Sequence, residues 1–224
     1  MAKAKRPPVH EELPASPRQV LRGLEYQVDA LRHVGEYFHQ RGWSLATSSN
    51  YSVVVDRDPL ELLITATGKD KSRLARTDFA RINTEGKPTT ANQPQASAEA
   101  HLHIALAEAA GAGAILHTHS VWGTILSDHY FASGGVVIEG YEMLKGLEGV
   151  TTHEHREWVP IFENTQDIPA LADQLRETLA QESPLLHGFL IRRHGLYTWA
   201  EDLDKARRHV EVFEFLFEVL GRRL

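Results

Sequence analysis

The chain has 224 residues and a formal net charge of −6, with 24 lysines and arginines against 30 aspartates and glutamates. This acidic balance argues against a general nucleic-acid or membrane-surface binder, because both of those partners are polyanionic. The chain has no cysteine, so disulfides and thiolate sites are excluded and any metal must be held by histidine, aspartate or glutamate. Hydrophobic residues make up 42% of the chain, which suits one large domain, with two small ones as the alternative.

Residues 1–15 contain three prolines and charges of both signs, and we expect a flexible tail there. Basic residues at the start lead into Pro7-Pro8 rather than into an apolar stretch, so we expect no signal peptide and a cytoplasmic protein. The folded domain is then expected at 16–224. Ser16-Pro17 is typical of a helix start.

Helical and strand-like segments alternate along this domain, which predicts an α/β sandwich. The first helix is expected to continue from Ser16-Pro17 to Gly42, with apolar residues at helical spacing as far as Phe38. The strands are predicted at 53–55, 60–65, 81–87, 114–119, 136–138, 158–162 and 189–191. The later helices are predicted at 97–110, 167–181 and 202–222, with a short helical stretch after Ser120.

Two histidines, His117 and His119, stand at the polar end of an apolar run that begins at Ala112. In a strand, side chains at i and i+2 point to the same face, so both imidazoles would project together, about 7 Å apart at their Cα atoms. Leu116 and Thr118 would face the other way. Zinc prefers neutral imidazole, and a catalytic zinc needs a third protein ligand and an open position. Spacing alone leaves two readings, a metal site or two polar residues at a strand end.

Other histidine pairs are weaker candidates. His153 and His155 have the same spacing without an apolar run beside them. His101 and His103 fall on a predicted helix, where residues two apart diverge, so we interpret them as non-ligands.

Small, hydroxyl-rich turns border two of the predicted strands, at Ser49-Asn50 and at Thr67-Gly68, with Lys71 shortly beyond. Such turns offer backbone N–H groups and hydroxyls to one anion, and plain hairpin turns are the alternative reading.

Two carboxylates are candidates for proton transfer. Glu99 lies in the first turn of a helix that Ser97 is expected to cap, where it either favours the positive helix end or is held near the metal. Glu142 follows the strand at 136–138, and without its motif it would be interpreted as a solvent-facing residue.

Taken together, these segments resemble the class II aldolase/epimerase/dehydratase family of sugar-phosphate lyases, over nearly everything from Gly23 to the C-terminus. The resemblance is carried by Gly42-Trp43, Ser49-Asn50-Tyr51-Ser52, Ile64-Thr65-Ala66-Thr67-Gly68-Lys69-Asp70-Lys71, Ala112-Gly113-Ala114-Ile115-Leu116-His117-Thr118-His119-Ser120, Glu142-Met143-Leu144-Lys145-Gly146, Val159-Pro160-Ile161-Phe162-Glu163-Asn164-Thr165 and Arg192-Arg193-His194-Gly195-Leu196-Tyr197-Thr198-Trp199.

The resemblance implies a single-domain three-layer α/β/α sandwich around a mostly antiparallel or mixed central sheet. It also implies one zinc per subunit, with His194 as the third ligand beside His117 and His119. The substrate phosphate would be bound by Ser49, Asn50, Thr67, Gly68, Lys71 and Ser97. The chain departs from the family pattern where Ser48 and Ser49 replace glycines and Ala98 replaces a serine. Glycine permits a closer backbone approach than serine does.

Three segments, Glu-Met-Leu-Lys-Gly, Pro-Ile-Phe-Glu-Asn-Thr and Arg-Arg-His-Gly, resemble the dehydratase branch of the family. That branch removes water from 5-methylthioribulose 1-phosphate in methionine salvage. It implies Glu142 as the acid/base, with Glu99 as second candidate because it matches the base of the aldolase branch. Family members resemble ring-like tetramers, and the last helix is apolar on most sides, so a homotetramer is expected.

Two alternatives remain. One is another zinc enzyme of the same fold, an aldolase or 4-epimerase acting on fuculose, rhamnulose or ribulose phosphates. The other is a non-enzymatic scaffold of the adducin type, which would be expected to lose the metal ligands that this chain retains.

Overall fold

The computed structural model describes residues 21–181 and 186–224. The tail expected at 1–15 and the helix start at Ser16-Pro17 lie outside these residues. The described chain forms one eight-stranded sheet with the strand order β3-β2-β1-β4-β8-β7-β6-β5. Its strands are β1 (Asn50–Arg57), β2 (Leu60–Thr65), β3 (Phe79–Ile82), β4 (Ala114–Thr118), β5 (Gly135–Glu139), β6 (Arg156–Phe162), β7 (Gly188–Ile191) and β8 (Gly195–Ala200).

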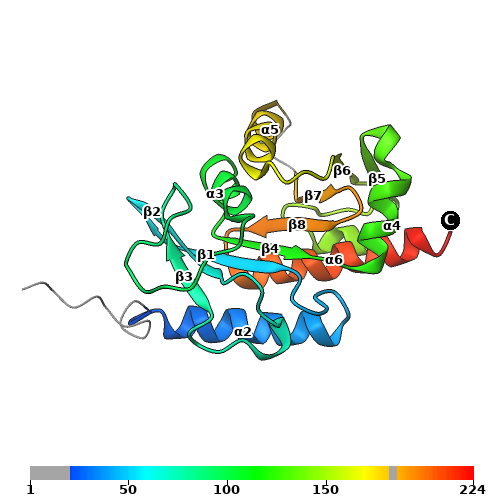
Figure 1. The fold of residues 1–224 in the computed structure, drawn as a ribbon. Helices are drawn as coiled ribbons and strands as arrows, with labels where there is room; N and C mark the ends of the chain where they lie inside the picture. Colours follow the sequence, from blue (N-terminus) through cyan, green and yellow to red (C-terminus); the bar gives the residue numbers. More distant parts are fainter. Residues whose placement is uncertain (1–20, 182–185) are drawn as a thin grey trace, which may run out of the picture.

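Helices cover both faces of this sheet (Figure 1). Neighbouring strands are antiparallel except β6 and β7, which run parallel, so the sheet is mixed. The helices are α2 (Glu25–Gln40), α3 (Ala100–Ala109), α4 (Val121–His129), α5 (Ile168–Gln181) and α6 (Leu203–Gly221), with short 3₁₀ turns η1 (Lys71–Arg73), η2 (Phe131–Ser133) and η3 (Glu142–Gly146). No helix in the described residues combines the length and apolar character needed to cross a membrane.

The alternation of side chains along β4 separates two layers of core. Ile115 packs with residues of α3 and α5 on one face, whereas Ala114 and Leu116 pack with residues of α2 and α6 on the other. Thr118 also points to the second face, where its hydroxyl donates a hydrogen bond to Glu214 of α6 (2.8 Å). The expected three-layer α/β/α sandwich around a mixed sheet is therefore confirmed.

The expected continuous first helix is wrong at its beginning. Residues 21–23 form a turn, and α2 starts only at Glu25. Gly23 has φ +84°, a left-handed conformation that helical backbone does not adopt. Apolar residues on either side of this turn keep a helical spacing, so periodicity alone did not reveal the break.

Two strand predictions also needed correction. β3 ends at Ile82, because the Asn83 side-chain oxygen accepts the backbone N–H groups of Glu85 and Lys87 (both 3.0 Å) and folds the expected strand end into a turn. Conversely, the polar segment from Asn50 to Ser52, expected as loop, is the start of β1 and pairs with β4. Its polar side chains face the site described next.

Candidate active site

Three histidines converge at one end of β4. His117 is a fully buried residue of β4, His119 follows the strand end, and His194 lies in the turn between β7 and β8. The Nε2 atom of His194 lies 3.3 Å from that of His117 and 3.2 Å from that of His119. A tetrahedral zinc with Zn–N bonds of about 2.0–2.1 Å holds its nitrogen ligands about 3.3 Å apart. The spacing of these imidazoles therefore fits a zinc ion.

The protonation of the cluster also suits a metal. The Nδ1–H group of His117 donates to the Leu196 carbonyl oxygen (2.8 Å), which leaves the Nε2 lone pair facing the other two rings. Burial, reinforced by neighbouring histidines, lowers the pKa of His117 well below its usual range and that of His119 to about 2. Burial also lowers the pKa of His194. All three rings are neutral at pH 7, which is the form that binds metal.

The neighbouring strands hold the His117 ring in place. Asn50 on β1 and Tyr197 on β8 are its direct cross-strand partners. The Tyr197 ring stacks on His117 with a centroid distance of 4.0 Å and on Phe189 with 5.0 Å. Burial, and then the nearby Glu99 carboxylate, raise the pKa of the Tyr197 hydroxyl well above its usual range. The His117 ring is therefore fixed in a packed aromatic layer.

Glu99, the residue that precedes α3, has its carboxylate directly against the histidines. Its Oε1 atom is 3.3 Å from Nε2 of His194, and its Oε2 atom is 3.6 Å from Nε2 of His117. The Asn50 amide donates to Oε2 of Glu99 (2.6 Å). Ser97 does not start the helix as expected: α3 begins at Ala100, and the Ser97 hydroxyl accepts the Glu99 backbone N–H (3.3 Å). This turn aims the Glu99 carboxylate at the cluster.

Sequence reasoning missed a buried residue behind Glu99. His103 binds the Ser52 hydroxyl through Nδ1 (2.7 Å) and the Asn50 side-chain oxygen through Nε2. Burial lowers the pKa of His103 to about 3, so it is a neutral ring that accepts at Nδ1 and donates at Nε2. This contact turns the Asn50 amide nitrogen toward Glu99. The available signal was the spacing of four residues between Glu99, which precedes α3, and His103 on α3.

Comparison with known proteins identifies the family. The family model described as class II aldolase and adducin N-terminal domain matches residues 29–220. The chain belongs to this family. Among curated relatives, the methylthioribulose-1-phosphate dehydratase of Marinobacter nauticus is 44% identical, covering 82% of this chain and 87% of its own length. That of Pectobacterium atrosepticum is also 44% identical, covering 88% of this chain and 95% of its own.

Solved structures agree on the class II aldolase fold. The l-fuculose-1-phosphate aldolase of Thermus thermophilus superposes with a TM-score of 0.69 at 24% identity, covering 87% of this chain and 94% of that one. A sugar-phosphate aldolase of Thermotoga maritima gives a TM-score of 0.64 at 16% identity, covering 89% and 95%. At these identities the likeness concerns the fold alone.

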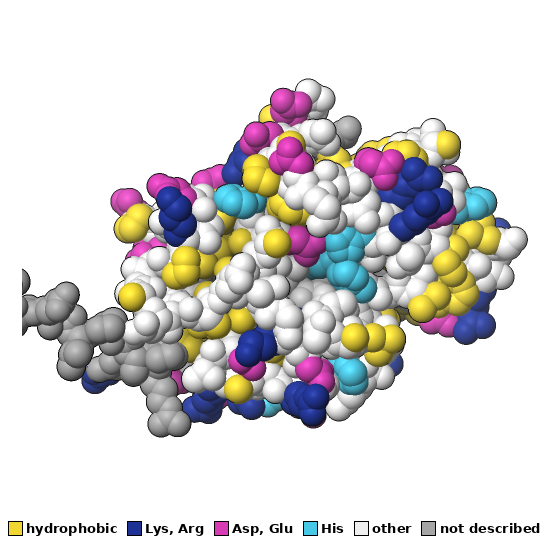
Figure 2. All heavy atoms as spheres, in the orientation of Figure 1, with side chains coloured by type: hydrophobic (Ala, Val, Ile, Leu, Met, Phe, Trp, Pro, Cys, Tyr) yellow, Lys and Arg dark blue, Asp and Glu magenta, His cyan; other side chains and the backbone are white. Residues whose placement is uncertain are grey.

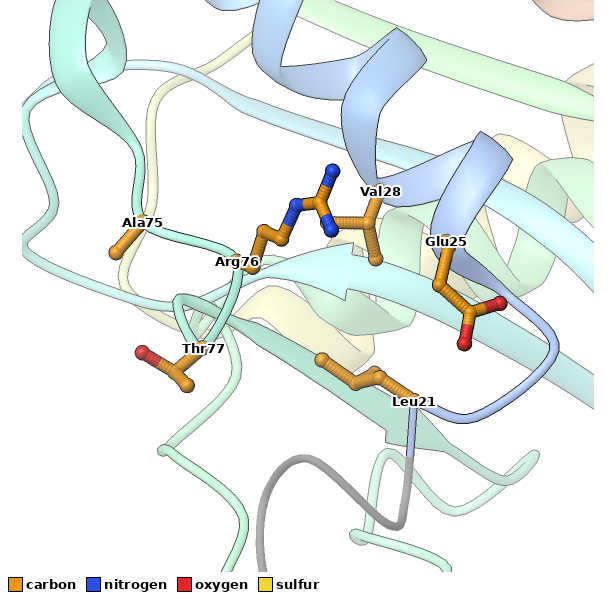
Figure 3. A pocket seen from close by; sticks show the side chains of 6 residues that line it. All are labelled: Leu21, Glu25, Val28, Ala75, Arg76 and Thr77. Carbon is orange, nitrogen blue, oxygen red and sulfur yellow. The ribbon is translucent and has the colours of Figure 1, made fainter.

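The surface of this class II aldolase domain is hollowed where histidine side chains gather near its centre, beside an acidic side chain (Figure 2). A separate pocket of about 580 Å³ lies between α2 and the 75–77 segment, where the Arg76 guanidinium extends toward Val28 (Figure 3). Neither its lining residues nor its place on α2 connects it with the histidine cluster. The hollow over the histidines is therefore the candidate site.

Among the residues expected to bind the phosphate, Lys71 offers a buried positive charge. Lys71 is buried with its Nζ donating to the Lys69 carbonyl (2.7 Å), and no ion pair of Lys71 is found within residues 21–181 and 186–224. Burial lowers its pKa to about 8. After burial and the other histidines, the charge of Lys71 also lowers the pKa of His117 and His119. A buried cation without a carboxylate partner suits an anionic ligand.

The two turns expected around the phosphate, at Ser49-Asn50 and Thr67-Gly68, each contain a residue with a positive φ angle. Ser49 has φ +70° at a position where the family usually has glycine, and its buried Oγ has no hydrogen-bond partner in the described part of the chain. Gly68 has φ +67°, and both Thr67 and Gly68 are exposed. The Asn50 amide nitrogen is already bound to Glu99 (2.6 Å) and Ser97 (3.1 Å). The Asn50 side chain is therefore held within the chain, and Asn50 is paired with His117 across β1 and β4.

Glu142 lies on η3, with its side chain 70% exposed. Its carboxylate contacts Nζ of Lys145 (2.6 Å) and Nδ1 of His153 (3.6 Å). The hydrogen bond from Lys145 lowers the pKa of Glu142. None of its contacts within the described residues is with the three-histidine cluster, so its role in proton transfer stays a prediction.

Proposed function

We propose that this chain is a zinc-dependent hydro-lyase that converts 5-methylthioribulose 1-phosphate into 2,3-diketo-5-methylthiopentyl 1-phosphate, a step of methionine salvage. The observation that carries the proposal is the convergence of His117, His119 and His194, with Glu99 within 3.6 Å of two of their Nε2 atoms. Relatives 44% identical over most of both chains are named methylthioribulose-1-phosphate dehydratase, which supports this substrate over the sugar phosphates of other class II aldolases.

The residues divide the chemistry between them. When bound by the three histidines, zinc supplies Lewis acidity at the open coordination position. Lys71, with the Ser49 and Thr67-Gly68 turns, would bind the substrate phosphate. A carboxylate removes the C3 proton, which is weakly acidic beside the C2 carbonyl, and a carboxylic acid gives a proton to the C4 hydroxyl as it leaves. We assign this proton transfer to Glu142, with Glu99 as second candidate.

The direct test is incubation of the purified, zinc-loaded protein with 5-methylthioribulose 1-phosphate. We expect the substrate to be consumed and a single diketone to form, as measured by absorbance and by mass spectrometry. Two carbon fragments would indicate aldol cleavage, and a substrate epimer would indicate a 4-epimerase. Either outcome would replace the dehydratase proposal by another reaction of the same fold.

Replacing Lys71 with methionine is expected to raise KM by about tenfold to a hundredfold, the worth of one charge-assisted hydrogen bond in a buried site. Methionine fills the space of the buried stem, so the fold should be kept. The matched control is Lys69→Met, which removes an exposed lysine that pairs with Asp78 (2.8 Å). Equal turnover of substrate lacking its phosphate would contradict this assignment.

We also propose that the protein is a homotetramer, although the apolar composition of α6 is no longer the main support for it. Most apolar residues of α6 are buried within the single chain, so the composition of this helix is less telling than expected. However, Phe215 of α6 is 47% exposed, and Val121 and Ile125, one helical turn apart on α4, are 63% and 41% exposed. Sedimentation equilibrium should give a mass near four chains, and a monomer at micromolar concentration would refute the proposal.

A further inference from the structure

A second group of metal-ligating side chains lies at the other end of β7 from the active site. His187 precedes β7, whereas His194 follows it. His155 and Glu157 stand two residues apart around the start of β6, the parallel neighbour of β7. Single ligand atoms of His155, Glu157 and His187 all lie within 4.8 Å of one another. Sequence spacing pointed to His153 beside His155, but the structure brings His187 there instead.

The carboxylate of Glu157 is the centre of this cluster. It is buried, with 1% of its side chain exposed, and its Oε2 atom lies 2.7 Å from Nε2 of His155 and 3.0 Å from Nδ1 of His187. In the part of the chain that the structure describes, Glu157 forms no ion pair with lysine or arginine. A buried carboxylate is costly unless a positive charge compensates it. Among the described residues, the compensating charge can come from a proton on one of the two histidines, and otherwise from a bound cation.

The His187 ring is oriented as a metal ligand would be. Its Nε2–H group donates to the Glu148 carbonyl oxygen (2.7 Å), which turns Nδ1 toward Glu157. The Glu148 backbone N–H in turn donates to Nε2 of His209 (3.0 Å), and Nδ1 of His209 is bound to the Trp199 carbonyl (2.9 Å). Backbone carbonyls that fix the second ring nitrogen are the usual outer partners of metal-bound histidines. A pocket of about 380 Å³ is lined by His187 and His209, on the side of the His187 ring that faces Glu148.

We propose that His155, Glu157 and His187 bind a second divalent transition-metal ion, separate from the active-site zinc. Two imidazoles and one carboxylate form a ligand set that zinc accepts, with water completing the coordination. Without the ion, a proton takes its place: although burial opposes it, the hydrogen bond with Glu157 raises the pKa of His187. The ion would join the start of β6 to the start of β7, so its role would be to stabilise the sheet and not to take part in catalysis.

The experiment is calorimetric titration of metal-free protein with Zn²⁺ at pH 7.5. We expect two ions per wild-type chain and one ion per chain in a His117→Ala, His119→Ala variant, which lacks the active-site ligands. Adding Glu157→Gln, which keeps the shape of the side chain, should abolish the remaining ion and the rise in Tm that zinc produces. Adding His153→Gln instead should leave both unchanged, because that histidine is 57% exposed and outside the cluster.

A wild-type stoichiometry of one ion overturns the proposal when the His117→Ala, His119→Ala variant loses that ion. So does a folded active-site variant, checked by circular dichroism, that binds no zinc at micromolar concentration. Neither outcome depends on whether the protein dehydrates 5-methylthioribulose 1-phosphate, because the readouts are metal content and Tm.

Discussion

Replacing His117 with alanine is expected to remove the active-site zinc and reduce dehydratase activity to background. His117 is the ligand with the most fixed geometry: it is fully buried, stacked on Tyr197 at 4.0 Å and bound through Nδ1 to the Leu196 carbonyl. Its loss leaves two imidazoles, those of His119 and His194, and both are partly exposed. Two imidazoles bind zinc far less tightly than three. Metal analysis of dialysed protein, alongside the activity assay, measures both effects.

The control for this variant is His33→Ala, an exposed histidine of α2 whose loss should change neither metal content nor activity. Because alanine also leaves a cavity beside Tyr197, thermal unfolding should be measured for both variants. An unchanged zinc content in the His117→Ala, His119→Ala double variant would show that the metal is bound elsewhere. The three-histidine assignment would then be wrong.

The part of the site that was predictable from sequence is the part that lies on one strand. Period-two alternation correctly brought the His117 and His119 rings together, with Leu116 and Thr118 opposite, although β4 ends at Thr118, one residue before His119. The third ligand, His194, came from family resemblance, since no local pattern distinguishes it from the other histidines. Its position 75 residues along the chain from His119 is set by the pairing of β4 with β8, which a single sequence does not reveal.

Contacts between elements account for what was missed. The chain of hydrogen bonds from Ser52 through His103 and Asn50 to Glu99 joins β1 to α3. Each residue has an ordinary local interpretation: His103 as an apolar-face histidine, Asn50 as a turn residue. Only the packing of α3 over the sheet gives them a common role. Likewise, the backbone conformation of Gly23 and the side-chain hydrogen bonds of Asn83, rather than the hydrophobic pattern, set the element ends that were predicted wrongly.

The second large effect is expected at Glu142. Glu142→Gln should lower kcat by about a hundredfold or more, the scale of one general acid/base, while zinc content and Tm stay unchanged. The structure makes this variant clean, because the side chain is 70% exposed and its contacts are with Lys145 and His153 on the surface. A loss of activity in this variant therefore cannot result from disturbed packing of the core. The matched control is Glu139→Gln, an exposed glutamate at the end of β5 that contacts Arg156 (3.6 Å).

Glu99→Gln is expected to cost less activity and to affect metal binding more. Its carboxylate lies 3.3 Å from Nε2 of His194 and 3.6 Å from Nε2 of His117, so a neutral amide there removes negative charge from beside the cation. The Asn50 amide, held by His103, would also face the amide of Gln instead of a carboxylate, which weakens the 2.6 Å hydrogen bond. A Glu99→Gln variant that keeps its zinc but is inactive, beside a Glu142→Gln variant that turns over normally, would reverse the two roles. Proton transfer would then come from the carboxylate that the single chain already holds against the histidines, as in the aldolase branch.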